Sequence, residues 1–88
     1  MKNCVYILLC SNDRYYIGST IDLRKRFYQH AEGIVKATRN LRPVKLAFYQ
    51  SYPTAKEARQ IEYWLKRQKD KDFILRIIKE GKIKKTLS

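Results

Sequence analysis

The chain of 88 residues carries 20 Lys and Arg against 8 Asp and Glu, a formal net charge of +12. This length supports one domain over residues 1–88, and a composition of 44% hydrophobic and 32% charged residues excludes a wholly disordered chain. Every apolar run is shorter than the roughly 20 residues that span a bilayer, so a cytoplasmic protein is expected. The charge predicts a polyanionic partner, with nucleic acid favoured over an anionic membrane.

The first predicted element is a hairpin. Residues 4–10 and 15–19 are rich in Val, Ile, Leu and Tyr, and the polar residues 11–14 form the turn between the two strands. Cys4 and Cys10, six residues apart on one strand, are separated by roughly 20 Å, too far for a disulfide. With one His and no Cys-x-x-Cys pattern, a zinc site is not expected.

The register of this hairpin decides whether its two central tyrosines share a face. A three-residue turn places Tyr6 opposite Gly18, with Tyr16 on the same face. A two-residue turn places the tyrosines on opposite faces, and the sequence leaves both registers open. Gly18 inside a strand indicates close approach of another group.

A helix is predicted next, with Asp22 or Thr20 as its cap and its end near Ala31. An apolar stripe is formed by Leu23, Phe27 and Ala31. Beside this stripe, an Arg and the chain's single His also share a face.

That pair is Arg26 and His30, at i and i+4. Arg24 and Lys25 point elsewhere, as ordinary solvent or phosphate contacts. The following residues, 34–43, are predicted to form a loop rich in basic and polar groups. Within it, Thr38, Arg39 and Arg42 are candidates for phosphate contacts, with a solvated loop as the alternative.

Residues 44–52 alternate as a third strand, with Val44, Leu46 and Phe48 on one side. Thr54 and Glu57 have capping-box spacing and start the longest predicted helix, which ends near residue 69.

One acidic residue of this helix points toward its apolar face. At 100° per residue, Glu62 lies 40° from Ala58, inside the stripe formed by Ala55, Ala58, Ile61 and Leu65. A carboxylate directed at a core is costly unless it is paired or binds a cation. Glu62 is therefore a candidate metal ligand, and the alternative is a surface ion pair at the edge of the stripe.

A last helix over residues 72–80 is followed by a basic tail from about residue 82, which we expect to fray. The element order ββαβαα predicts an α+β fold, a small three-stranded antiparallel sheet flanked by helices.

Taken together, these residues resemble the GIY-YIG nuclease superfamily. The tyrosine of the first motif is Tyr6, the second motif is Tyr16-Ile17-Gly18, and Arg26 and Glu62 follow. The patterns "YIGST-DL-KR---H", "RPVKL" and "EA---E--LK" are similar to the small stand-alone bacterial single-domain group related to the nuclease domain of the excision-repair endonuclease. The resemblance covers about residues 3–80.

The resemblance implies a role for each matching residue. Tyr6 and Tyr16 position or deprotonate the attacking water, and Gly18 allows tight packing of the hairpin. Arg26 stabilises the charge that develops on the phosphate.

The same resemblance makes His30 an acid–base or water-network residue and Glu62 the ligand of one divalent cation, Mg²⁺ or Mn²⁺. Arg24, Lys25, Arg39 and Arg42 become candidate nucleic-acid contacts. The implied activity is a divalent-metal-dependent DNA endonuclease linked to DNA repair or recombination.

Two departures from the family pattern shape this expectation. The first motif is Cys4-Val5-Tyr6 in place of Gly-Ile-Tyr, and no Asn follows Glu62. We expect no appended DNA-recognition domain, and therefore structure-directed or weakly specific cleavage. The alternative is a non-catalytic nucleic-acid-binding module that keeps the nuclease fold.

Overall fold

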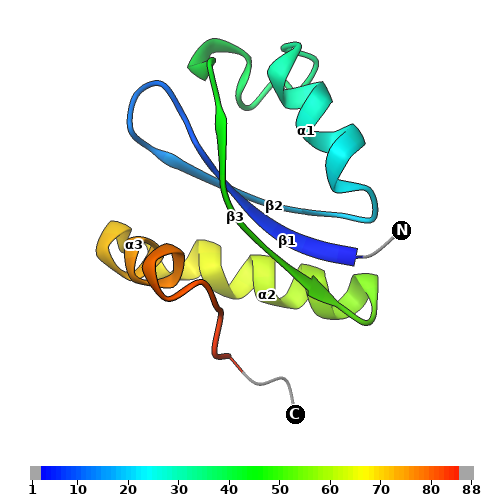
Figure 1. The fold of residues 1–88 in the computed structure, drawn as a ribbon, viewed down its shortest axis with the longest axis vertical. Coiled ribbons are helices and arrows are strands. Elements are labelled where there is room, and N and C mark those ends of the chain that lie inside the picture. The colour runs from blue at the N-terminus through cyan, green and yellow to red at the C-terminus, as the bar shows by residue number, and fades with distance from the viewer. Residues whose placement is uncertain (1–2, 86–88) are drawn as a thin grey trace.

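The computed structural model describes residues 3–85, in which a sheet lies between one helix on one side and two helices on the other (Figure 1). The elements are β1 (Asn3–Leu9), β2 (Tyr15–Thr20), α1 (Leu23–Ala31), the 3₁₀ turn η1 (Arg39–Leu41), β3 (Lys45–Tyr52), α2 (Ala55–Gln68) and α3 (Lys71–Glu80). The predicted α+β fold and its order ββαβαα are confirmed, with η1 inside the predicted loop. Within the described residues, no helix is both long and apolar enough to cross a membrane.

The sheet has the order β2-β1-β3, and both pairings are antiparallel. The central strand β1 is covered on both faces, which explains why residues 4–8 are a continuous apolar run and are all buried. Tyr6 and Leu8 face α1, while Val5 and Ile7 face α2 and α3. The strand β2 lies at one edge of the sheet.

The hairpin adopts the first of the two registers that the sequence left open. The Cys10 backbone N–H donates to the Arg14 carbonyl at 2.9 Å, which closes a three-residue turn. Tyr6 is paired with Gly18, and Leu8 with Tyr16. Both tyrosines therefore lie on the α1 face of the sheet.

The prediction that Val44, Leu46 and Phe48 share one side is wrong. The pairing of β3 with β1 shifts between Ile7 and Leu8, because β3 contains an extra residue there. Val44 consequently packs in the cluster on the α1 face, and Phe48 packs in the core beneath the other face.

The apolar stripe of α1 also differs from its prediction at one position. Asp22 is the cap, since its Oδ1 accepts from the Lys25 backbone N–H at 3.1 Å. Phe27 packs against the sheet, but Ala31 is exposed and His30 is buried in its place. A helix turns about 100° per residue, so His30, seven residues after Leu23, points closer to the direction of Leu23 than Ala31 does.

The helices α2 and α3 cover the opposite face. Their buried residues are Ala58, Ile61, Leu65, Ile74 and Ile77. After α3 the chain folds back onto β3: Ile83 is 3% exposed, and its backbone N–H donates to Gln50 Oε1 at 2.8 Å. The expectation that the tail frays from residue 82 is therefore wrong at Ile83, and its last part, residues 86–88, lies outside the described residues.

Candidate active site

The ring of Tyr6 packs against the backbone of Gly18, its partner across the hairpin. A Cβ built on Gly18 would lie 2.5 Å from Tyr6 Oη and 2.6 Å from its Cζ. Any side chain at this position would displace the phenol, which is 1% exposed. Close approach of a ring, as the sequence suggested for a strand glycine, is the reason that this position is Gly.

The Tyr6 hydroxyl begins a buried chain of hydrogen bonds. Tyr6 Oη lies 2.9 Å from His30 Nε2, and His30 Nδ1 lies 2.7 Å from Thr38 Oγ1. His30 and Thr38 are both fully buried. The prediction that Thr38 contacts phosphate is therefore wrong, because its hydroxyl is sealed inside and bonds the imidazole.

Burial controls the protonation of this chain. It lowers the pKa of His30 to about 4, and the positive charge of Arg26 contributes to the lowering. Burial raises the pKa of Tyr6 to about 12, with smaller contributions to that rise from Tyr16 and Glu62. At neutral pH the imidazole and the phenol are both uncharged. One imidazole nitrogen then donates and the other accepts, so the proton of Thr38 or that of Tyr6 points at the ring.

Tyr16 is the more accessible of the two phenols. Its ring centroid lies 5.0 Å from that of His30 and 6.4 Å from that of Tyr6, and the side chain is only partly buried. The structure thus brings Tyr6, Tyr16 and His30 together on the α1 face, as the resemblance implied.

Arg26 reaches this cluster from α1. Its pKa is raised above the usual value, first of all by the Tyr6 phenol beside it. Its Nη1 donates to Gln29 Oε1 at 3.1 Å, which holds the guanidinium in place. Because it is only partly buried, the guanidinium remains available to an anion from outside.

Glu62 approaches from the other face, on α2, and meets the free edge of β2. Ser19 Oγ donates to Glu62 Oε1 at 2.5 Å, and Lys66 Nζ lies 2.6 Å from Oε2. The Glu62 side chain is 20% exposed. The carboxylate is thus paired at the edge of the apolar stripe. Its partner Ser19 directly follows Gly18, the glycine that packs against Tyr6.

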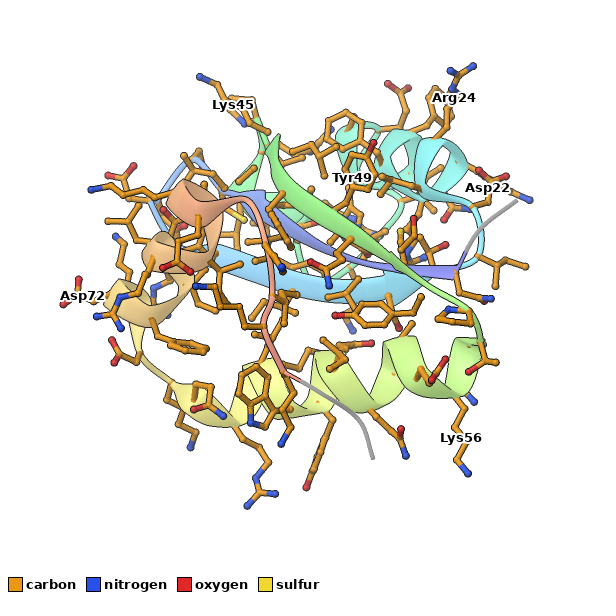
Figure 2. All side chains as sticks on the ribbon, turned by 60° about the horizontal axis from the view of Figure 1, so that its bottom comes forward. Asp22, Arg24, Lys45, Tyr49, Lys56 and Asp72 are labelled. Carbon is orange, nitrogen blue, oxygen red and sulfur yellow. The ribbon has the colours of Figure 1, made fainter. Side chains whose placement is uncertain are left out.

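A shallow hollow of about 410 Å³ lies beside this edge, between the end of β2 and α1. We call it the Arg26 hollow; Ser19, Lys25, Arg26 and Gln29 are among the residues that line it. Lys25 thus lines the same hollow as Arg26, and its contact with nucleic acid stays a prediction. Arg24, in contrast, is exposed and extends away from the body of the protein (Figure 2).

The residues around Glu62 fit one kind of metal site. Within residues 3–85 there is no group of three or more His, Cys, Asp or Glu side chains that could enclose an ion. A single carboxylate beside a hydroxyl fits a cation such as Mg²⁺ that keeps most of its ligands as waters and phosphate oxygens. Lys66 would have to release Oε2 for such an ion to bind there.

The two arginines of the loop after α1 hold its backbone. Arg39 Nε donates to the Gly33 carbonyl at 2.8 Å, and Arg42 Nε donates to the Arg39 carbonyl at 2.9 Å. The same loop carries Thr38, which contacts His30. Both arginine side chains are otherwise exposed, so their contact with phosphate stays a prediction.

Two further residues of the site, Ser19 and Lys66, were not predicted from the sequence. Lys66 had a local signal, since it lies four residues after Glu62 on one helix. Ser19 had none, because its partner is 43 positions away in the chain.

The family model described as the GIY-YIG catalytic domain matches residues 2–73 of the chain. The chain belongs to the GIY-YIG family. It is 44% identical over 73 residues to a UPF0213 protein of Bacillus velezensis, which covers 78% of this chain and 74% of that protein. A UPF0213 protein of Pediococcus acidilactici is 34% identical over 86 residues, covering 94% and 88%.

A solved structure has the same fold. The solution NMR structure of the UPF0213 protein BH0048 from Bacillus halodurans matches with a TM-score of 0.59 and 32% identity, over 92% of this chain and 87% of that one. The resemblance to a small stand-alone GIY-YIG group, a nuclease family, is thus confirmed.

Proposed function

We propose that this GIY-YIG protein is a divalent-metal-dependent endonuclease that hydrolyses DNA phosphodiester bonds in repair or recombination. One observation carries the proposal: a phenol, a guanidinium and a carboxylate come from three separate elements to the region of Tyr6 and the free edge of β2. Tyr16 of β2 and Arg26 of α1 lie beside the Tyr6 phenol, and Glu62 of α2 accepts a hydrogen bond from Ser19 of β2. Phosphodiester hydrolysis needs an activated water and charge stabilisation at the phosphate, and these groups can supply both.

Arg26 binds the scissile phosphate in this proposal. A guanidinium offers a planar set of donors that matches phosphate oxygens and stays charged at every relevant pH. Lys25 lines the same hollow and adds a second positive charge. The bound phosphate offsets the charge of Arg26, which is one of the two causes of the low pKa of His30. Substrate binding thereby makes His30 a better proton acceptor.

The two phenols orient the attacking water. Tyr16, the more exposed, holds the water by a hydrogen bond. Tyr6 Oη can accept a proton from that water while its own proton moves to His30 Nε2, 2.9 Å away. The water oxygen forms the new bond to phosphorus, the bond to the leaving oxygen breaks, and solvent supplies the proton that this oxygen takes up. Thr38 holds the imidazole in line for this transfer.

Glu62 would hold the cation, with Ser19 orienting the carboxylate. A bound Mg²⁺ or Mn²⁺ supplies charge neutralisation at the phosphate and the leaving oxygen. The groups that surround the scissile phosphate are Lys, Arg and Ser side chains, which contact backbone phosphates and do not read base edges. We therefore expect structure-directed or weakly specific cleavage.

Cleavage of supercoiled plasmid and branched oligonucleotides with Mg²⁺ or Mn²⁺ tests the proposal. Wild type would be compared with Glu62→Ala and Tyr6→Phe, with and without a chelator. We expect cutting that both substitutions and the chelator abolish. If wild type cuts no form of DNA faster than Glu62→Ala, the proposal is wrong.

A non-catalytic nucleic-acid-binding module is the second candidate, and the Glu62–Lys66 pair favours it. An ammonium 2.6 Å from Oε2 neutralises the carboxylate without a metal ion. This candidate predicts salt-sensitive DNA binding that is the same with and without Mg²⁺, and no cleavage by any variant.

A further inference from the structure

A second hollow, of about 600 Å³, lies along the free edge of β2, where the strand faces the end of α2 and the start of α3. We call it the basic groove. Arg14 lines it from the β1–β2 turn, Tyr16 from β2, Lys66 and Lys69 from α2 and its cap, and Lys71 from α3. Four cationic side chains from three parts of the chain thus converge on one concave surface.

The positive charge of this groove is hardly offset. Its single acidic residue is Asp70, whose Oδ1 accepts from the backbone N–H groups of residues 72 and 73 and so caps α3. Lys66 is paired with Glu62, but within residues 3–85 Arg14, Lys69 and Lys71 take part in no ion pair. Like charges placed together without partners raise the local concentration of an anion.

An unfavourable backbone conformation at Lys69 helps to bring these cations together. Lys69 ends α2 in the left-handed region, with φ 48°, where Gly or Asn is the usual residue. After this reversal, Lys69 and Lys71 line the same hollow as Arg14. Figure 1 shows the junction of α2 and α3 at the same end of the molecule as the β1–β2 turn. Lys71 Nζ lies over the Tyr15 ring of β2, 5.9 Å from the ring centroid.

The basic groove is connected to the active site through Glu62. Ser19, which donates to Glu62 Oε1, lines the Arg26 hollow, while Lys66, which pairs with Oε2, lines the basic groove. The carboxylate therefore stands between the two hollows. Residues 15–19 of β2 span about 13 Å at a rise of ~3.3 Å per residue, which is room for a short run of phosphates.

We propose that the basic groove binds the sugar-phosphate backbone of the DNA strand that is cut, on one side of the scissile phosphate. The strand crosses the Glu62 carboxylate from the Arg26 hollow and continues along the free edge of β2 to Arg14, Lys69 and Lys71. This inference rests on the proposed function, since that function places the scissile phosphate at Arg26. It adds the path of the strand across the protein surface and three phosphate-binding residues outside the catalytic groups.

The test compares two variants that lose the same charge. The groove variant is Arg14→Gln/Lys69→Gln/Lys71→Gln. The control is Arg59→Gln/Lys56→Gln/Lys79→Gln, which also removes one Arg and two Lys, all exposed and none lining either hollow. Lys56 lies at the start of α2, and Figure 2 shows it pointing away from the sheet. Thermal melts of both variants would establish that they fold.

Binding is measured by fluorescence anisotropy of labelled duplex and branched oligonucleotides in EDTA, over a range of salt concentrations. The groove variant is expected to bind on the order of 100-fold more weakly at about 0.1 M salt, with a salt slope lower by roughly 2 to 3, because each lost contact removes about 0.9 from the slope. The control should keep the wild-type slope. Equal losses in the two variants would overturn the inference. If the triple variant unfolds, Lys69→Gln/Lys71→Gln against Lys56→Gln/Lys79→Gln gives the same comparison.

Failure of the inference and failure of the proposed function are distinguishable, because binding in EDTA needs no cleavage. If wild type cuts DNA and the groove variant binds DNA like the control, the proposed role of the basic groove is wrong and the proposed nuclease activity is supported. If nothing cuts but only the groove variant loses affinity, the catalytic proposal fails and the groove remains a DNA-binding surface.

Discussion

On the α1 side of β2, Tyr6, His30 and Thr38 are each at most 1% exposed, whereas at its free edge the side chains of Glu62 and Lys66 are 20% and 50% exposed. These three buried side chains contain no charge at neutral pH, and each of their N and O atoms has a hydrogen-bond partner. The edge carries the Glu62–Lys66 ion pair, in which water, a metal ion or a phosphate can replace either partner. A few residues of one strand thus separate buried groups, whose hydrogen-bond partners are fixed, from exposed groups, whose partners can change.

The largest expected effect comes from filling the space that Tyr6 occupies. Gly18→Ala places a Cβ within 2.5 Å of Tyr6 Oη, so we expect loss of DNA cleavage and a drop of about 3 kcal/mol in the free energy of unfolding. Urea unfolding and the plasmid assay measure both. Gly81→Ala is the control: it meets nothing within 4 Å and loses about 1 kcal/mol, for its positive φ alone. Equal costs at the two positions would contradict the packing argument.

The pH dependence of stability probes the buried side. His30 has a pKa of about 4 in the folded protein against 6.5 for a free side chain, so between these values the unfolded chain binds the extra proton and the folded one does not. Stability therefore falls as the pH is lowered from 7 to 5, by about 2 kcal/mol from this group. Urea unfolding at several pH values measures it. His30→Gln should lack most of this slope; an unchanged slope would show that His30 is not its source.

The partner of His30 can be removed with little change of shape. Thr38→Val leaves Nδ1 buried without a hydrogen bond, and we expect a loss of about 1–2 kcal/mol. Because the chain has a single His, the ¹⁵N NMR shifts of its ring nitrogens report the tautomer without ambiguity. We expect Thr38→Val to change the proportion of the two tautomers and Thr38→Ser to restore it. Identical ring shifts in all three proteins would rule out a positioning role for Thr38.

The smallest effect on stability is expected at the exposed side. Lys66→Gln removes an i, i+4 pair worth about 0.3–0.5 kcal/mol but frees Glu62 Oε2, so Mn²⁺ affinity should rise several-fold. Calorimetric titration of Mn²⁺ measures this. Lys84→Gln breaks the other i, i+4 pair, with Glu80, and should leave Mn²⁺ binding unchanged. A weaker Mn²⁺ affinity in Lys66→Gln would mean that Lys66 does not compete with the ion.

The patterns that predicted the elements correctly were all local. Capping by Asp22 and Thr54, the stripe of α2 and the continuous apolar run of β1 each depend on residues that are close together in the chain. The error in the third strand arose where a distant segment decides, because the bulge opposite β1 turned Phe48 to the opposite face from Val44. The error in α1 was local, since a turn of 100° per residue favours His30 over Ala31 on the buried face.

The sequence alone determined the kinds of groups that make the site: two phenols, a glycine, an arginine, a histidine and a misplaced carboxylate, in an order typical of the GIY-YIG family. Only the tertiary structure decided how they are connected. The hairpin register brought Tyr6 onto Gly18, the folded loop carried Thr38 to His30, and α2 placed Glu62 between Ser19 and Lys66. The physical reason is range, because periodicity and caps act over a few residues, whereas these contacts depend on how strands and helices pack.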